Sequence, residues 1–310
     1  MQGLPDLAEA LAAPLPVLMD GAMGTELTRR GAPIGAAKWV GSTLDMAGDV
    51  ADLHRAYDRA GAKLHIANTF AAARHVLRQL DQEDRFEAVN SAAVRVCRDA
   101  VCGGWIAGSI STYVIGSDRA NLPRGAELTR SVEEQARLLA DLGCEMIVLE
   151  MLFDVETNIT MIEAVASAGL PLSVGLTCMA GPGGAIHLRD EYIGRLRPEL
   201  RLETAMPQIV AALPEGAVLT IMHSDLDVTD RALEIARDTW SGLLGVYPNS
   251  GRLIVPDGWD HGAVCTPEVF VDHALNWVRQ GAAFIGGCCG IGPDHIAALA
   301  RALNEENQDG

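Results

Sequence analysis

Two adjacent cysteines near the carboxyl end of the sequence are the residues best suited to chemistry. Cys288 and Cys289 lie in the run Gly286-Gly287-Cys288-Cys289-Gly290. Neighbouring side chains of a regular strand point to opposite faces, so the pair can share one site only where a strand ends, and flanking glycines permit that break. Thiolates are soft ligands that favour zinc. We interpret the pair as zinc ligands; the alternative is two buried cysteines that pack as small apolar groups.

A third ligand is required, because catalytic zinc sites use three protein ligands and leave one position open. His223 follows the apolar run 217–222 and is the best candidate. Asp225 and Asp227 follow closely and could ligate the metal or orient the histidine. Cys178, which ends another apolar run, is a further possible ligand. The alternative for His223 is a cap of the next helix.

Polar groups suited to a small amino-acid ligand also follow apolar runs. Asp20 and Glu150 could receive an ammonium group, since a buried carboxylate is costly without a partner. For Glu150, an arginine or backbone donors would be the ordinary partner. The glycine-containing segment after Asp20 exposes N–H groups that can hold a carboxylate. The predicted substrate-binding residues are Asp20, Gly21, Ala22, Met23, Asn68, Glu150 and Asn249.

Aromatic residues are scarce, at 5% of the chain, yet several fall in or beside the segments that follow apolar runs. Aromatic faces attract methylated onium groups. Trp39, Tyr113 and Trp259 are therefore predicted to bind a cationic ligand, and packing within a lid is the alternative for each. A serine hydrolase is not indicated, because the sequence has no G-x-S-x-G segment.

Eight short apolar runs alternate with longer amphipathic stretches, a pattern typical of parallel strands separated by helices. Eight such units predict a single (β/α)8 barrel of the TIM type over residues 1–310, with an open doubly wound sheet as the alternative. Chemistry in a TIM barrel belongs at the carboxyl ends of the strands. The segments 111–130, 179–201 and 250–266 could form lids there. The predicted strands are 17–23, 63–70, 105–110, 146–152, 171–178, 217–224, 242–249 and 283–290.

Charge and cysteine content narrow the class of protein. The 310 residues carry a net charge of −17, which argues against nucleic acid or an anionic membrane as the main partner. Seven cysteines cannot all pair and show no disulfide framework, so a reducing, cytoplasmic location is expected. No signal peptide is recognised. The uncharged stretch 164–188 contains glycines and prolines and is interpreted as a helix end, a strand and a loop.

Together these motifs resemble the homocysteine S-methyltransferases, a family that includes betaine– and S-methylmethionine–homocysteine methyltransferases. The resemblance covers nearly the whole chain and implies a barrel with zinc at its mouth, held by Cys288 and Cys289. In the family a third cysteine ends the sixth strand, and His223 stands at the corresponding position here. The matching segments are 20–25 (DGAMGT), 67–70 (ANTF), 108–109, 149–150, 247–251 (YPNSG) and 284–290 (FIGGCCG).

The resemblance implies methyl transfer from an onium donor to the zinc-activated thiol of homocysteine. The amino group would bind near Asp20 and Glu150, and the donor would be S-methylmethionine, betaine or a related sulfonium. The altered loop at Ser111–Val114, where relatives often have G-P-Y-G, and His223 leave two alternatives open. One is a zinc barrel that methylates another small thiol or selenol; the other is a non-catalytic metal- or thiol-binding barrel. A hydrolase using His223 with Asp225 is a further competitor. Small-molecule substrates are the expected partners, and a homo-oligomer is possible.

Overall fold

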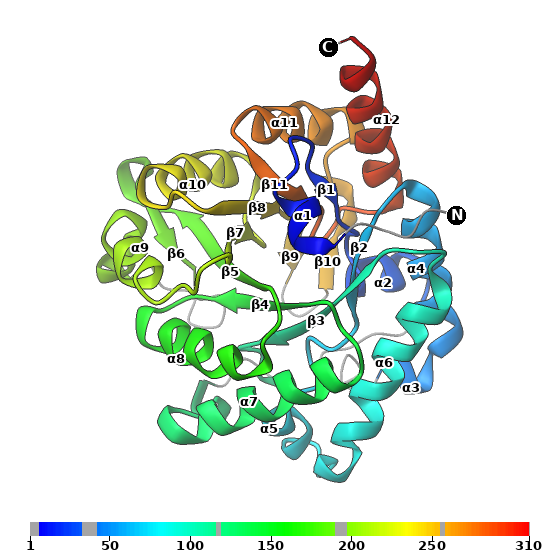
Figure 1. The fold of residues 1–310 in the computed structure, drawn as a ribbon, viewed down its shortest axis with the longest axis vertical. Coiled ribbons are helices and arrows are strands. Elements are labelled where there is room, and N and C mark those ends of the chain that lie inside the picture. Colours follow the sequence, from blue (N-terminus) through cyan, green and yellow to red (C-terminus); the bar gives the residue numbers. More distant parts are fainter. Residues whose placement is uncertain (1–5, 33–41, 116–118, 190–196, 255–257, 310) are drawn as a thin grey trace.

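Eight parallel strands form a closed barrel surrounded by helices (Figure 1). The computed structural model describes residues 6–32, 42–115, 119–189, 197–254 and 258–309. Within this part, the strands follow the order β1-β11-β8-β7-β5-β4-β3-β2 around the sheet. Their bounds are β1 Val17–Leu18, β2 Leu64–Ala67, β3 Trp105–Ser111, β4 Met146–Leu152, β5 Leu172–Ala180, β7 Val218–Met222, β8 Leu243–Tyr247 and β11 Ala282–Ile285.

The first and last strands meet, which closes the sheet. Val17 of β1 pairs in parallel with Phe284 of β11, and a parallel bridge joins Met19 to Leu64 of β2. Closure leaves both end strands of the barrel sheet paired and confirms the predicted TIM barrel over the open doubly wound sheet.

The helices agree with the predicted amphipathic stretches, with one clear difference. The structure begins α7 at Gly125, inside the segment predicted as a lid, because Leu128 and Val132 already pack into the core. The predicted lid 111–130 is shortened accordingly. The helices between strands are α4 Ala47–Ala60, α6 Phe86–Ala100, α7 Gly125–Asp141, α8 Val155–Val165, α9 Leu202–Val210, α10 Leu226–Thr239, α11 Pro267–Arg279 and α12 Pro293–Asp309.

Short additional elements lie at the two ends of the barrel. At one end, α1 (Leu7–Leu11) places Leu7 and Leu11 against the side chains that fill the barrel (Figure 1). Strands β6 (Ile186–Leu188), β9 (Arg252–Ile254) and β10 (Gly258–Asp260) lie inside the segments predicted as lids. The other short helices are α2 Gly24–Arg29, α3 Ser42–Asp45 and α5 Arg74–Arg78.

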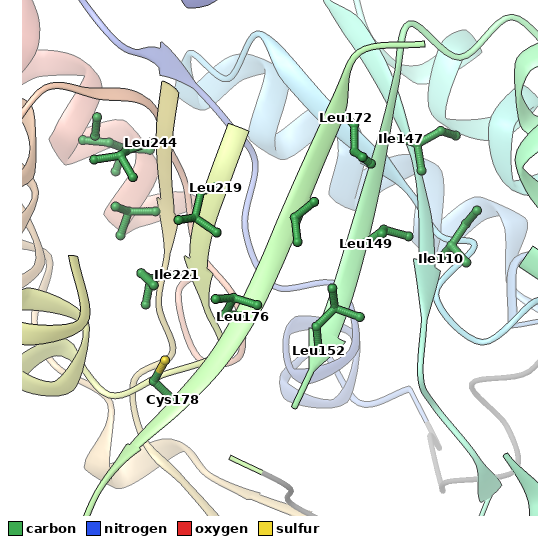
Figure 2. Packing of buried hydrophobic residues seen from close by; sticks show 14 of the residues in the cluster. Ile110, Ile147, Leu149, Leu152, Leu172, Leu176, Cys178, Leu219, Ile221 and Leu244 are labelled. Carbon is green, nitrogen blue, oxygen red and sulfur yellow. The ribbon is translucent and has the colours of Figure 1, made fainter. Parts of the chain in front are cut away.

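The apolar core has an inner and an outer part. The inner part fills the barrel with Met19, Met146, Met222, Tyr247 and Phe284. The outer part lies between strands and helices, where alternate residues of neighbouring strands form rows of branched side chains (Figure 2). No described helix is long and apolar enough to cross a membrane. Residues 164–188 form the end of α8, β5 and β6, as the sequence predicts.

Candidate metal centre

His223, Cys288 and Cys289 come together at the carboxyl ends of β7 and β11. Their ligand atoms all lie within 4.8 Å of one another. The Nδ1 atom of His223 is 3.2 Å from the Sγ atom of Cys288, and the two sulfur atoms are 4.0 Å apart. A set of one imidazole and two thiols is suited to a divalent ion such as zinc.

The cysteines share a site because β11 has already ended at Ile285. The chain then leaves the ladder, and the N–H of Cys288 donates to the carbonyl of Pro248 (2.7 Å). Gly290 has φ of +81°, and a Cβ atom there would collide with the carbonyl oxygen of Ser250. Only glycine meets both requirements, so the loop that holds the cysteines depends on this residue.

His223 occupies an unusual backbone conformation. It directly follows β7, is buried, and has φ of +45°, a region that L-residues with a Cβ rarely adopt. Such strain is often found where a side chain must be directed at a functional site. The N–H of His223 donates to the carbonyl of Tyr247 (3.1 Å), which ties the residue to the end of the neighbouring strand β8.

The thiol of Cys288 resists ionisation without a cation. The pKa of Cys288 is raised well above its ordinary value, first by the hydrogen bond with Cys289 and then by burial, while His223 acts in the opposite direction. Two adjacent thiolates would repel each other in this partly buried place, and a bound dication removes that penalty. The donor set and its electrostatics therefore fit a metal ion.

The other residues considered as ligands do not join this group. Cys178 is buried in the outer core layer beside Ile221 (Figure 2). Its N–H donates to the Ser224 hydroxyl (2.8 Å). Asp225 and Asp227 are exposed at the start of α10. Neither carboxylate orients the imidazole in this structure, which also removes the geometric basis for a His223–Asp225 hydrolase.

Glu150 is a buried carboxylate at the end of β4. The hydroxyl of Ser109 donates to its Oε2 atom. Burial raises its pKa, against the effects of Ser109, Tyr247 and His223. The Tyr247 hydroxyl lies near this carboxyl without reaching hydrogen-bond geometry to any described residue. A buried acid next to an uncommitted hydroxyl is suited to a cationic ligand.

Asp20 is buried in the turn that follows β1. Its Oδ2 atom accepts a hydrogen bond from the N–H of Ile66 (3.0 Å), and burial, followed by the proximity of Glu150, raises its pKa well above the usual value. Mutual repulsion between the two carboxyls is relieved by a shared cation.

The turn after Asp20 is only partly available to a carboxylate. The N–H of Ala22 donates to the carbonyl of Ile291 (2.9 Å), so Ala22 is already committed. Among the described residues, the N–H groups of Gly21 and Met23 have no such partner. A Cβ atom on Gly21 would collide with the same Ile291 carbonyl, which explains the need for glycine.

The two asparagines differ in their surroundings. Asn68 donates from Nδ2 to the hydroxyl of Thr43 (3.0 Å). Asn249 is buried, and its Oδ1 atom has no hydrogen-bond partner among the described residues. Asn249 is therefore the better placed of the two to bind a ligand.

The aromatic residues predicted to bind the donor are spread over different places. Trp259 lies beside the centre, with its ring centroid 6.4 Å from that of His223, and its indole N–H donates to the carbonyl of Ser250 (2.9 Å). Tyr113 packs on Phe70, with centroids 5.4 Å apart. Trp39 lies outside the described residues.

Tyr57 is a site residue that the sequence does not reveal. It lies on α4, is fully buried, and donates from its hydroxyl to the carbonyl of Ala22 (2.7 Å), with the carbonyl of Ile291 3.3 Å away. It thereby joins the turn after Asp20 to the loop that follows the cysteines. In the sequence it is one apolar position of an amphipathic helix, so no signal distinguishes it.

Fold and site together define a TIM barrel with a thiol-rich candidate metal centre at the carboxyl ends of its strands. The family profile of homocysteine S-methyltransferase matches residues 17–303, and the chain belongs to this family of methyltransferases.

Similar proteins agree with that assignment. The homocysteine S-methyltransferase of Escherichia coli is 29% identical, with 91% of this chain and 94% of the relative covered. The S-methylmethionine–homocysteine S-methyltransferase BHMT2 of Pongo abelii is 26% identical over 94% of this chain and 79% of the relative. The crystal structure of the homocysteine methyltransferase MmuM from E. coli, in a metallated form, is similar in fold, with a TM-score of 0.73 at 24% identity and 96% and 100% coverage.

Proposed function

We propose that the protein transfers a methyl group from an onium donor to the thiol of homocysteine and so forms methionine. S-Methylmethionine, betaine or a related sulfonium is the proposed donor, and Zn²⁺ held by His223, Cys288 and Cys289 is the proposed cofactor. The observation that carries the proposal is the meeting of these three ligand atoms within 4.8 Å at the barrel mouth. Residues 1–310 would act as one barrel domain, in the cytoplasm, on small molecules.

The ligand set determines how strongly the acceptor is activated. When bound, zinc supplies a Lewis acid that favours the thiolate form of the homocysteine thiol. Cys288 and Cys289 contribute two negative charges, whereas the neutral imidazole of His223 contributes none. The substrate sulfur therefore retains less electron density than it would opposite three thiolates, and it is a weaker nucleophile, other things being equal.

The amino-acid part of homocysteine is bound by residues of the turn after β1 and by Glu150 on β4. The buried carboxyls of Glu150 and Asp20 receive the ammonium group, which compensates the cost of burying both acids. The free N–H groups of Gly21 and Met23 receive the carboxylate. This arrangement fixes both charged groups of the substrate and leaves only its thiol to be aligned.

Methyl transfer needs alignment and exclusion of water more than proton transfer. A carbon–sulfur bond forms as the bond from the methyl group to the onium atom breaks, and the electron pair leaves with a neutral product. No general acid is needed. Trp259, beside His223, offers an aromatic face to the cationic donor. Trp39 and Tyr113 are proposed to complete the donor site on the basis of the sequence.

The test is an incubation of the purified, zinc-loaded protein with homocysteine and a panel of CD₃-labelled onium donors. Formation of labelled methionine, detected by mass spectrometry and absent with Cys289→Ala, supports the proposal. Stoichiometric zinc without methionine from any donor contradicts it.

A second candidate is methylation of another small thiol or a selenol by the same centre. The presence of His223 favours it, because a weaker activating charge suits an acceptor that is more acidic or more nucleophilic than homocysteine. Selenohomocysteine is the sharpest probe. A higher kcat/KM with the selenol than with homocysteine, at equal zinc content, supports this candidate. No turnover with either acceptor would leave a non-catalytic metal- or thiol-binding barrel as the remaining interpretation.

A further inference from the structure

Two histidines lie close to Asp20, the first residue of the substrate-binding turn. His54 on α4 and His65 on β2 are fully buried, and their Nδ1 atoms are each 4.0 Å from Oδ2 of Asp20. The three residues also form a compact group by their ligand atoms, all within 4.8 Å of one another. A carboxylate and two imidazoles thus share a buried space between the barrel and its helices.

Three of the four ring nitrogens of these histidines have no hydrogen-bond partner among the described residues. Neither ring nitrogen of His65 reaches a partner with hydrogen-bond geometry in the described part of the chain, and its Nε2 atom lies 4.0 Å from Oδ1 of Asp58. Burial lowers the pKa of His65, and Asp58, followed by the Ala62 carbonyl, acts in the opposite direction. The Nε2 atom of His54 is likewise unpartnered there, and its Nδ1 lies 3.6 Å from the Cys97 sulfur. Buried polar atoms without partners are rare and call for an explanation.

Both histidines are neutral at physiological pH. Burial lowers the pKa of His54 to about 3 and, as its largest cause, that of His65 to about 4. A neutral imidazole carries one N–H, so each ring can donate one hydrogen bond. Asp20 needs such donors, because in the described part of the chain the N–H of Ile66 is the one group from another residue seen to donate to its Oδ2 atom, and burial penalises its charge.

Helix α4 connects this group to the substrate-binding turn. His54 and Tyr57 are three residues apart and therefore share one face of the helix. Tyr57 holds the carbonyl of Ala22, while His54 faces the carboxylate of Asp20. The same helix face thus contacts both ends of the Asp20–Ala22 segment.

We propose that His54 and His65 are positioning residues for Asp20. Their N–H groups bind the Asp20 carboxylate, after a small ring rotation or through one water that spans the 4.0 Å gaps, and hold it where it receives the ammonium group of the amino-acid substrate. The inference rests on the proposed function, because it assigns Asp20 the task of binding that group.

A buried metal ion is the competing explanation of the same three residues. A dication at this place would repel the ammonium group that Asp20 is proposed to bind, so the two roles exclude each other. Measured zinc content therefore discriminates between them: one equivalent belongs to the cysteine centre, and a second, lost on removal of His65, would overturn the inference.

The test is a double-mutant cycle on the zinc-loaded, full-length protein, read by isothermal titration calorimetry. The ligands are homocysteine and 4-sulfanylbutanoate, which lacks the amino group. We expect His65→Leu to weaken homocysteine binding about tenfold, the effect of one hydrogen bond to a charged group, and to leave 4-sulfanylbutanoate unchanged. His65→Asn, which restores a donor, should recover most of the affinity, and in an Asp20→Asn background His65→Leu should add little.

Controls separate positioning from a merely structural role. His187→Leu removes another buried histidine, on β6, and should affect neither ligand. Should His65→Leu fold poorly, the pair His54→Leu and His54→Asn makes the same comparison from α4. Equal weakening of both ligands, or an undiminished effect of His65→Leu in the Asp20→Asn background, would overturn the inference while leaving the proposed function intact. If the wild-type protein binds neither ligand, the proposed function itself fails.

Discussion

The Nδ1 atom of His223 lies 3.2 Å from the Sγ atom of Cys288, although 65 residues separate them in the chain. Their strands, β7 and β11, are not neighbours in the sheet, because β8 lies between them. The two side chains meet only because both lie beyond the strand ends, where the chain is no longer bound by the ladder. The metal centre therefore depends on the closed barrel, which brings the loops after two separate strands together, and no single βα unit contains all three ligands.

Cys289→Ala should abolish stoichiometric zinc binding and leave the fold nearly unchanged. The residue lies in the loop after β11, outside the inner and outer core. The free energy of unfolding of the metal-free variant should therefore differ by no more than about 1 kcal/mol from that of the metal-free wild type. Zinc content by elemental analysis and urea unfolding in the presence of a chelator measure the two effects. Cys144→Ala, a buried cysteine away from the centre, should keep its zinc; retention of a full equivalent by Cys289→Ala would contradict the ligand assignment.

His223→Cys should keep or tighten metal binding, whereas His223→Ala should weaken it by roughly 100-fold. This is the effect expected when one of four ligands is lost and its part of the zinc-binding free energy is lost with it. With Co²⁺ as the probe, the cysteine variant should also show stronger thiolate charge-transfer absorption. Because the residue has φ of +45°, His223→Asn is the matched control: asparagine tolerates this conformation but does not replace the imidazole. If affinity and spectrum are the same in the wild type and His223→Cys, the histidine does not bind the metal.

The sequence predicts the barrel well, because its strands are apolar on both faces and end in polar residues. It overestimates strand length where chemistry begins: 17–23 and 283–290 are predicted, whereas the ladders contain only Val17–Leu18 and Ala282–Ile285. The segments that hold Asp20 and the cysteines leave the ladder to form turns. Their composition alone does not show where the last strand hydrogen bond falls.

Residue type and position in the sequence predict some of the site residues and not others. Strand alternation could have excluded Cys178, because it has the same parity as Leu172 and Leu176, which face the outer layer (Figure 2). Tyr57 and His54 have no comparable signal, since their roles depend on how a helix packs over a distant turn. Such contacts arise only from the tertiary structure.

Glu150→Gln should weaken homocysteine binding by roughly 10- to 100-fold, the loss of a hydrogen bond to a charged group, and leave zinc content unchanged. The expected loss is in KM more than in kcat, because the carboxyl binds the ammonium group and not the reacting sulfur. Glu163→Gln, an exposed position on α8, is the control. Unchanged affinity in Glu150→Gln would show that the ammonium group binds elsewhere.

Homocysteine should stabilise the protein more as the pH rises above the ordinary glutamate value of 4.5. Burial raises the pKa of Glu150 in the folded state, so this residue's contribution to stability is present at low pH and is lost as pH rises through the raised pKa. An ammonium ligand reverses the preference because it binds the ionised form. The groups that act on the Glu150 carboxyl are Ser109, Tyr247, His223 and the neighbouring Asp20. Asp20 in turn faces His54, His65, Tyr57 and Cys97. Shifts in Tm with and without ligand, from pH 5 to 8, measure this; a ligand shift independent of pH would contradict it.

Tyr57→Phe should cost about 1–3 kcal/mol of unfolding free energy, because it leaves the buried carbonyls of Ala22 and Ile291 with one donor fewer. Since Tyr57 joins the turn after Asp20 to the loop after Cys289, the variant should also weaken homocysteine binding while retaining zinc. Urea unfolding and calorimetry measure the two effects. Thr28→Val, which removes an exposed hydroxyl bonded to Gly24, should cost no more than about 0.5 kcal/mol. A loss of stability in Tyr57→Phe without any loss of homocysteine affinity would show that the tyrosine supports the fold alone and does not position the substrate turn.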